Sequence, residues 1–386
     1  MNILELIENH YRTLKESDFK GFDLYDGLES RIFKKSPFFK SRLFRLAWIQ
    51  LFKRSPVNFR SLFLVPGGYN AKGLAMFIKG LVNLYKLKKE REYLREAYRL
   101  ADIIISQRAK NRDYFCVGYN FFWEAKAFSV PAFTPNMIVS SFVAQAFLDL
   151  YDIDKDKKWL NYSLEIGRFI DKELKLFESD ETIVFGYIPG EDTIVHNVNL
   201  MGSRLFARLY SYTKEEKYRE YATKSAQYSI NSQREDGAWV YGKSHYLQWV
   251  DNFHTGFNLV ALNDVQRYLS IKQWQERIDL GLKYHFKHHF LEDMTPKYYV
   301  SKLYPIDIHN FAQGIDTFIS LGYRDNARKL LEKSIDLMWD SNKHYFYYQK
   351  RGFYTNKINY IRWGQAWMFY AMTEYRIKKG KQIWEN

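Results

Sequence analysis

Two acidic residues and two histidines recur at similar positions in neighbouring stretches of this sequence. Asp251 precedes His254, and Asp307 precedes His309, each pair standing just before an apolar run. Two carboxylates across a cleft can act as general acid and general base in glycosidic-bond cleavage. A histidine whose pKa lies near neutrality can instead abstract a proton from carbon. These four residues are the candidate catalytic residues.

The same four residues also have structural interpretations. An aspartate before an apolar-periodic run is a typical N-cap, whose side chain accepts a hydrogen bond from a free N–H group of the helix. A histidine in such a run is often half-buried and hydrogen-bonded between helices. For either aspartate taken alone, the capping role is the more general expectation.

Aromatic and polar residues accompany these candidates. The turn Asp236-Gly237-Ala238-Trp239 is suited to presenting an indole plane, because glycine tolerates positive φ. Aromatic planes wetted at one edge are typical of sugar-binding clefts, although they also fill wide helix interfaces. An arginine among them, Arg362, could neutralise a substrate carboxylate or join a connector to a helix. The candidate binding residues are Trp123, Glu124, Asn197, Asp236, Trp239, Trp249, Tyr304, Arg362 and Trp363.

Metal and cofactor motifs are weak in this sequence. His285, His288 and His289 have a spacing that can bind zinc, but they fall at the end of a helical pattern, where cationic side chains favour the dipole. The run Asp152–Asp156 begins like a calcium loop, yet Lys157 replaces the needed glycine. We therefore predict no metal site and no cofactor.

Internal repetition indicates the elements that position the candidate residues. A Leu-Tyr pair, a short polar segment and an aromatic residue eight positions after the tyrosine mark the junction between two helices. This junction occurs three times in similar form: at Leu84-Tyr85 with Tyr93, at Leu150-Tyr151 with Trp159, and at Leu209-Tyr210 with Tyr218.

Polar caps or turns precede six apolar-periodic runs, at intervals of roughly 50 to 65 residues. Second helices are expected near residues 90–107, 156–173, 215–232, 272–289 and 325–339. The sixth run lacks a second helix, and either N-terminal helix, at 2–15 or 38–53, could supply it. The sequence therefore predicts an all-α (α/α)6 toroid in which residues 1–65 close the ring formed by 66–386, effectively as one domain. The six starting positions are Asn70, Asn136, Asn197, Asn252, Asn310 and Asn359.

The longer connectors alternate with the short turns and carry β-like runs at Thr182–Tyr187, Lys297–Val300 and Tyr345–Gln349. In such a ring all of them lie on one face, together with the N-termini of the inner helices. We expect the functional site on that face.

Composition bounds the class of protein and its partners. The 386 residues are 46% hydrophobic and 18% aromatic, so a large core is expected, and the formal charge of +14 favours an anionic partner. Because Lys and Arg are spread along the whole chain, we expect no nucleic-acid partner. The single cysteine, Cys116, indicates a reducing compartment and a cytoplasmic location. No apolar window is long enough for stable membrane insertion.

Beyond these patterns, the sequence resembles known families. The toroid expected here is similar to six-hairpin glycosidases, uronate-acting lyases and sugar 2-epimerases, and Gln233–Trp239 fits a repeat of terpenoid cyclases. The segments GYNFFWEAKAFSVPAFTPN, WVDNFHTGF, KLYPIDIHNFAQ and FYTNKINYIRWGQAWMFYA resemble VpsJ-like proteins of bacterial capsule and biofilm polysaccharide loci. This resemblance implies a role in making a surface glycan, with possible contacts to other polysaccharide-assembly proteins.

Three hypotheses follow for function. The favoured one is a carbohydrate-active enzyme that acts on an acidic oligosaccharide or polysaccharide as glycoside hydrolase, lyase or epimerase. The second is a glycan-binding or assembly protein that keeps the toroid without chemistry. The third is a polyprenyl- or terpenoid-type enzyme, whose cavity would be lined by aromatics without paired carboxylates.

Overall fold

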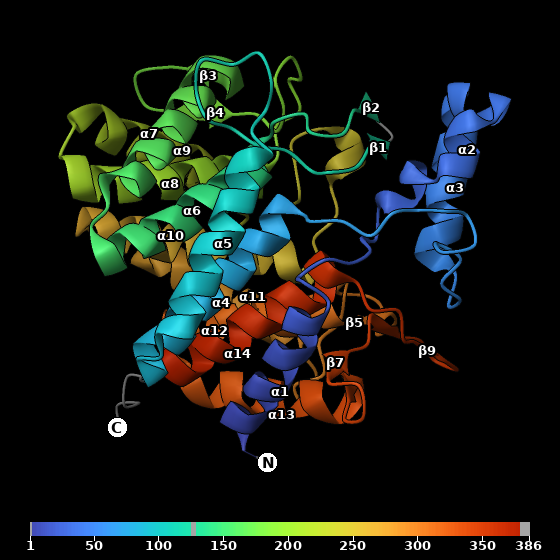
Figure 1. Cartoon of the computed structure of the whole chain (residues 1–386). Coiled ribbons are helices and arrows are strands. Elements are labelled where there is room, and N and C mark those ends of the chain that lie inside the picture. Colours follow the sequence, from blue (N-terminus) through green and yellow to red (C-terminus); the bar gives the residue numbers. More distant parts are fainter. Residues whose placement is uncertain (1, 125–128, 379–386) are drawn as a thin grey trace.

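The computed structural model describes residues 2–124 and 129–378, and it is mostly helical (Figure 1). Within the described residues, six helices form an inner ring in which each contacts the next and the last, α14, returns to α4. They are α4 (Ala71–Lys88), α6 (Met137–Asp154), α8 (His196–Thr213), α10 (Asn252–Leu269), α12 (Ile308–Leu321) and α14 (Trp367–Ile377). The predicted all-α (α/α)6 toroid is confirmed.

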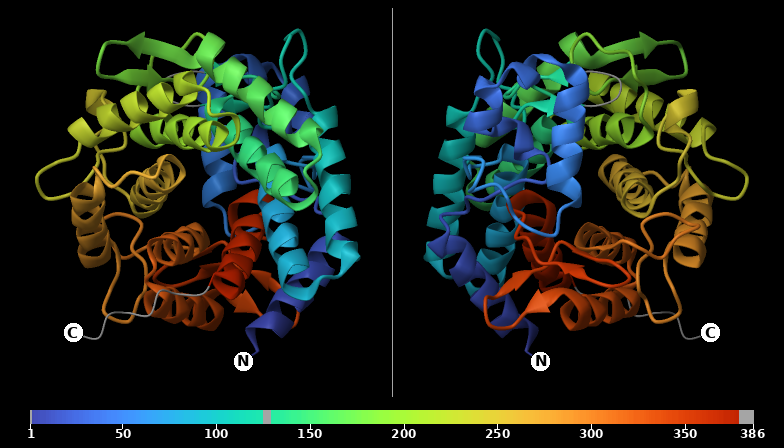
Figure 2. Two further views of the ribbon diagram at one scale, coloured as in Figure 1. Left: turned by 90° about the vertical axis from the view of Figure 1, so that its left-hand side faces the viewer. Right: turned by 90° about the vertical axis from the view of Figure 1, so that its right-hand side faces the viewer.

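An outer layer of helices surrounds this ring, as the two side views show (Figure 2). Its helices are amphipathic: α5 buries Tyr93, Ala97 and Ile104 on one face, at the spacing of helical turns. The inner helices are buried on nearly all sides and are correspondingly apolar. The outer helices are α5 (Arg91–Ser106), α7 (Lys157–Phe169), α9 (Glu216–Asn231), α11 (Gln275–His289), α13 (Arg324–Met338) and α1 (Ile3–Glu16).

The two N-terminal helices have different places. Helix α1 packs against α14, and its Glu8 and Lys15 form ion pairs with Lys88 and Glu92 at 2.6 and 2.5 Å. Helix α3 (Arg42–Arg54) packs instead against the 3-10 turns Asp26–Glu29 and Pro37–Lys40 and against β1, and its Trp48 ring stacks on Phe33 of α2 (Arg31–Lys35). Thus α1 is the outer partner of α14. That residues 1–65 and 66–386 behave as one domain stays a prediction.

The starts of the inner helices follow from side-chain capping. Asn70 and Asn136 accept hydrogen bonds from the N–H groups of Gly73 and Val139, as the sequence predicts. In the next three hairpins the helix begins earlier than predicted, because Val195, Asp251 and Asp307 occupy the N-cap positions. Asn197, Asn252 and Asn310 therefore lie inside the first turns of these helices. Asn359 precedes a π-helical turn, Ile361–Ala366, that leads into α14.

Short antiparallel strands join the connectors. The expected strand at Lys297–Val300 is not formed, because the chain turns back between Tyr299 and Lys302 and makes only isolated bridges there. No described helix is both long and apolar enough to cross a lipid bilayer. The pairs are β1 (Trp123–Glu124) with β2 (Ser129–Val130), β3 (Lys175–Glu178) with β4 (Ile183–Phe185), β6 (Trp339–Asp340) with β7 (Tyr345–Phe346), and β8 (Gln349–Lys350) with both β5 (Ile306–Asp307) and β9 (Thr355–Asn356).

Candidate active site

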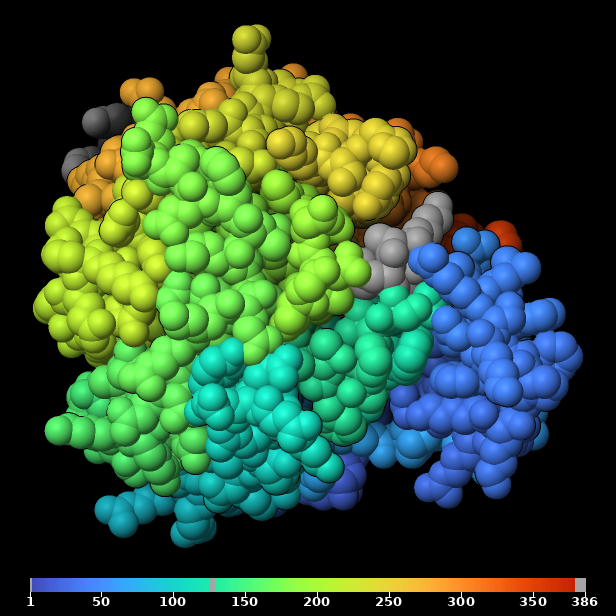
Figure 3. All heavy atoms as spheres, turned by 90° about the horizontal axis from the view of Figure 1, so that it is seen from above, coloured from blue at the N-terminus to red at the C-terminus, as the bar shows by residue number. Residues whose placement is uncertain are grey.

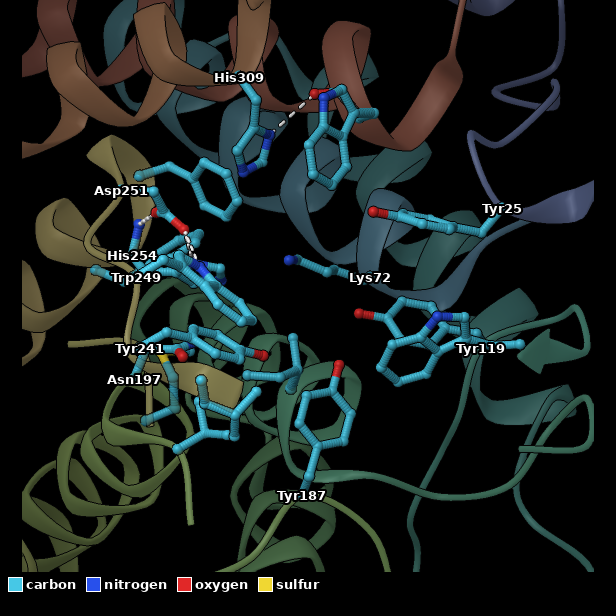
Figure 4. Close-up of a pocket in the computed structure, with 18 of the residues that line it drawn as sticks. Tyr25, Lys72, Tyr119, Tyr187, Asn197, Tyr241, Trp249, Asp251, His254 and His309 are labelled. Atoms are coloured by element: carbon cyan, nitrogen blue, oxygen red, sulfur yellow. Dashed lines mark hydrogen bonds and ion pairs between the residues drawn. The ribbon is translucent and has the colours of Figure 1, made fainter. Parts of the chain in front are cut away.

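A cavity of about 530 Å³ opens among the connectors, at the N-terminal ends of the inner helices (Figure 4). Its floor comes from first turns of five inner helices, and its walls from aromatic residues of the connectors. This is the face on which the sequence places the site. The floor residues are Lys72, Ile138, Asn197, Phe253, His254 and His309, and the wall residues include Tyr25, Tyr119, Tyr187, Tyr241, Trp249 and Tyr298.

Asp251 and His254 form a hydrogen-bonded pair at the cavity. Asp251 caps α10, accepting from the His254 N–H group at 3.0 Å, and its second oxygen lies 2.7 Å from His254 Nδ1 and 3.0 Å from Trp249 Nε1. Burial acts to raise the pKa of Asp251, but the charge and hydrogen bonds of His254 outweigh it and hold the pKa below its ordinary value. The ionised carboxylate thus accepts Nδ1–H and leaves Nε2 of His254 available to a substrate.

His309 has an equivalent arrangement with a different acceptor. Its Nδ1 lies 3.0 Å from the carbonyl oxygen of Trp363, so Nδ1 carries the hydrogen and Nε2 is an acceptor. The ring also stacks on the Trp363 indole at a centroid distance of 4.5 Å. Burial, with the nearby charges of Lys72 and Arg362, holds the pKa of His309 well below its ordinary value. The imidazole is therefore neutral, with its hydrogen on Nδ1 and an unprotonated Nε2.

The two imidazoles flank a single aromatic ring. The Phe253 ring lies 4.1 Å from His254 and 5.0 Å from His309, centroid to centroid, and all three side chains line the cavity. Figure 4 shows both imidazoles on one side of the cavity, with Tyr25 and Tyr119 on the opposite side. A small molecule bound there can be reached by the Nε2 atoms of two separate imidazoles.

Two cationic side chains border the same space. Arg362 donates two hydrogen bonds to Asp23, at 2.6 and 2.7 Å, so its charge is balanced within the protein. Lys72 is 5% exposed, and no described residue forms a hydrogen bond or ion pair with its ammonium group. Its Nζ lies instead over the rings of Phe142, at 4.5 Å, and Trp367, at 5.4 Å. Burial, followed by the charge of Arg362, holds the pKa of Lys72 well below its ordinary value.

Sequence reasoning missed Lys72 and the tyrosines. The signal for Lys72 was a lysine in the first turn of an otherwise apolar helix, directly after the Asn70 cap. The tyrosines gave no comparable signal, because Tyr is abundant throughout the chain. In the structure Tyr241 stacks on Trp249 with ring centroids 4.6 Å apart, which presents an extended aromatic plane to the cavity.

Asp307 does not line the cavity, and the expected Asp251–Asp307 pair across the site is not formed. Asp307 is fully buried and accepts hydrogen bonds from Gln349 Nε2 at 2.6 Å, Trp363 Nε1 at 2.9 Å and the His309 N–H group at 2.9 Å. Burial raises its pKa above the ordinary value, against the hydrogen bonds. Its contacts are those of an N-cap that also joins β5 to β8 and to Trp363.

The candidate binding residues divide into two groups. Trp123, Asn197, Trp249, Arg362 and Trp363 line the cavity. The other four candidates lie elsewhere, each with partners of its own. Glu124 is buried in ion pairs with Arg42 and Arg45, Asp236 pairs with Arg234 in an exposed turn, Trp239 is buried and donates to the Ser229 carbonyl, and Tyr304 is exposed on a connector.

Two further candidates are explained by burial. His285 and His289 are buried on the outer helix α11 with their Nδ1 atoms 3.3 Å apart, and among the described residues no three His, Cys, Asp or Glu side chains could jointly hold a metal ion. Cys116 is fully buried, and burial raises the pKa of its thiol to about 12. This cysteine therefore packs as a small apolar residue.

Comparison with solved structures identifies the architecture. The chain superposes on a cellobiose 2-epimerase from Bacillus thermoamylovorans with a TM-score of 0.64 at 11% identity, covering 81% of this chain and 89% of that one. An unsaturated glucuronyl hydrolase specific for heparin gives 0.58 at 12% identity, covering 80% and 88%. A family 76 mannosidase from Bacteroides thetaiotaomicron gives 0.59 at 14% identity, covering 81% and 88%. At such identities the likeness shows the six-hairpin fold alone.

No protein-family model matches the sequence, and no curated protein sequence is significantly similar to it. The resemblance to proteins of capsule and biofilm loci therefore stays a prediction.

Proposed function

We propose that this protein is an enzyme that transfers a proton at the carbon next to the carbonyl group of a sugar, as an epimerase or isomerase. The observation that carries the proposal is the pair of imidazoles at one cavity. His254 and His309 each have Nδ1 engaged by a fixed acceptor, so each has Nε2 available to a bound molecule. Solved six-hairpin structures that are epimerases or isomerases by name support the choice.

The proposed chemistry needs one base, one acid and charge stabilisation. One imidazole takes the proton from the carbon beside the carbonyl of an open-chain sugar, and the electron pair moves onto the carbonyl oxygen as an enediolate. The other imidazole returns a proton to the opposite face of that carbon, which inverts its configuration. In an isomerase the proton returns instead to the former carbonyl carbon, and the hydroxyl hydrogen of the first carbon passes to the former carbonyl oxygen, which moves the carbonyl. The positive charge of Lys72, which has no counter-ion among the described residues, stabilises the enediolate oxygens.

We further propose that the sugar is acidic and belongs to an oligosaccharide or polysaccharide precursor. Lys72 lacks a counter-charge among the described residues, and the formal charge of the chain is +14. A cytoplasmic role in capsule or biofilm polysaccharide biosynthesis, with contacts to other assembly proteins, belongs to this proposal and rests on the lone cysteine and the sequence resemblance.

A glycoside hydrolase is a weaker candidate. Retaining and inverting hydrolases use two carboxyl groups across the scissile bond. Among the described residues that line this cavity, Asp251 is the one carboxylate, and it is engaged by His254 and Trp249. A lyase acting on a uronic acid is the second candidate, because it would use the same imidazoles and Lys72.

The test is hydrogen exchange in heavy water. Free neutral and acidic sugars are incubated with the protein, and loss of the proton beside the carbonyl is followed by nuclear magnetic resonance. We expect exchange with the native protein and a loss of about 10²- to 10⁴-fold in His254→Asn and His309→Asn. Asp251→Asn should also slow exchange, because its carboxylate orients His254.

The matched control is His288→Asn, which removes an imidazole from the outer helix α11 and should leave the exchange rate unchanged. Cleavage of disaccharides without exchange would identify a hydrolase, and an unsaturated product would identify a lyase. Sugar binding without exchange or cleavage would indicate a binding protein.

A further inference from the structure

A second surface of the molecule has an unusual composition. The segment 30–65 contains no aspartate or glutamate, whereas the chain as a whole has 44. It includes α2, α3 and the turns around them, which stand out from the ring beside the connectors (Figure 1). Its basic residues are Arg31, Lys34, Lys35, Lys40, Arg42, Arg45, Lys53, Arg54 and Arg60.

The same segment exposes large apolar side chains. Leu43 is 73% exposed and Leu62 is 68% exposed, values far above those of a packed residue. Viewed from above, this part of the chain projects from the body of the protein (Figure 3, blue). Apolar side chains gathered in this way mark an interaction site rather than scattered surface residues. The exposed apolar residues are Ile32, Phe38, Leu43, Phe44, Leu51, Val57, Leu62 and Leu64.

Helix α3 has apolar side chains on two faces, one exposed and one packed against the protein. Leu43, Phe44 and Leu51 are exposed, while Ile49 and Phe52 on the other face are buried. The Phe38 ring contacts Phe44 at 4.8 Å, which extends the exposed face onto the preceding turn. The apolar residues on the outer face are therefore not needed for the packing of the helix.

Four of the basic residues are free to meet an anionic partner. Lys34 pairs with Glu29, Arg42 and Arg45 pair with Glu124, and Arg60 is buried against Asp26. Arg31, Lys35, Lys40 and Arg54 are exposed and form no ion pair with any described residue. They lie before, between and after the exposed apolar side chains.

We propose that segment 30–65, the docking segment, binds the surface of an anionic lipid bilayer. Lysine and arginine are drawn to anionic headgroups, while exposed leucine and phenylalanine side chains enter the boundary between headgroups and acyl chains. Helix α3, with 13 residues, lies on the surface because it is too short to span the bilayer. A neutral protein partner would not require a segment of 36 residues without an acidic group.

The docking segment also contacts the cavity. Lys53 of α3 lines the cavity, and its Nζ lies 3.3 Å from the Tyr25 hydroxyl. If the proposed sugar chemistry holds, docking brings the cavity close to a substrate carried on a membrane lipid. Membrane binding itself does not depend on that chemistry.

The test is co-sedimentation of the full chain with lipid vesicles. We expect binding to vesicles of phosphatidylglycerol and phosphatidylcholine in equal amounts, weak binding to phosphatidylcholine alone, and release at high salt. A triple apolar variant (Leu43→Ser, Phe44→Ser, Leu51→Ser) and a charge variant (Lys35→Glu, Lys40→Glu, Arg54→Glu) should each bind at least about tenfold more weakly.

The matched control replaces three exposed apolar residues elsewhere, Phe286→Ser, Leu291→Ser and Phe353→Ser, and should bind as the native chain does. Circular dichroism establishes that each variant is folded. Absence of binding to anionic vesicles, or equal binding by the native chain and both docking variants, would overturn the proposal. So would a native dimer, seen by sedimentation equilibrium, that the apolar variant dissociates while vesicle binding is unchanged.

Discussion

At the scale of single residues, the fixed partner of a side chain decides what that side chain can do. Asp251 and Asp307 both cap inner helices, Asp251 by accepting from the N–H group three residues later and Asp307 by accepting from the N–H group two residues later. Asp251 uses its second oxygen to hold a histidine at the cavity, whereas Asp307 uses its second oxygen to hold Gln349 in the interior. The first arrangement fits the proposed proton transfer, and the second fixes the connectors.

Lys72 gives a prediction about substrate charge. Replacing it with methionine should weaken binding of an acidic sugar by about 10- to 100-fold, because a charge-assisted hydrogen bond is lost, and should change binding of the matching neutral sugar little. Isothermal titration with glucuronate and glucose measures both affinities.

The protonation of Lys72 provides a control. Because its pKa is well below the ordinary lysine value, affinity for the acidic sugar should fall as the pH rises through that lowered pKa. Lys72→Arg should bind the acidic sugar without this dependence. Equal affinity of the native protein and Lys72→Met for glucuronate would refute the role of Lys72 in binding acidic sugars. It would not bear on the proposed proton exchange with neutral sugars.

At the scale of elements, the first turns of the inner helices supply side chains that line the cavity. Each brings its N-terminal residues to the same face, so side chains from distant hairpins meet at one cavity. The positive ends of these helix dipoles also favour negative charge there. The connectors then supply the aromatic walls, and short strand pairs such as β5 with β8 hold them in place.

Asp307 gives a prediction about these connectors. Asp307→Ala should lower the free energy of unfolding by about 3 to 5 kcal/mol, because it removes an N-cap and leaves the Gln349 and Trp363 donors buried without acceptors. Denaturant unfolding measures this loss. The rate of proton exchange per folded molecule should fall less than about tenfold, far less than in His309→Asn. A stable Asp307→Ala protein with no exchange activity would instead assign Asp307 to the chemistry.

At the scale of the whole molecule, closure of the ring buries polar groups that a single hairpin would leave in water. Burial lowers the pKa of His196 to about 4 and that of His10 to about 3, so these histidines are neutral in the folded protein. As the pH falls, both histidines lower the free energy of unfolding, and this effect is independent of the cavity.

His196 allows this cost to be measured. The unfolded chain takes up a proton at His196 near pH 6.5, whereas the folded protein does so near pH 4. Between these values stability on account of His196 falls as the pH falls, by about 1.4 kcal/mol per pH unit. In urea unfolding, the free energy of unfolding of His196→Phe should therefore fall less steeply with decreasing pH than that of the native protein, by about 1.4 kcal/mol per pH unit. Identical slopes for the two proteins would mean that His196 is protonated in the folded state.

The sequence by itself determined the helices, their pairing into hairpins and the face on which the cavity opens. Apolar periodicity, side-chain caps such as Asn70 and short polar turns act between residues close in the chain, so they can be read locally. Only the tertiary structure decided which side chains reach the cavity. That choice depends on contacts between distant residues, such as Arg362 with Asp23 and Trp363 with Asp307, because burial and pairing are set by the closed ring.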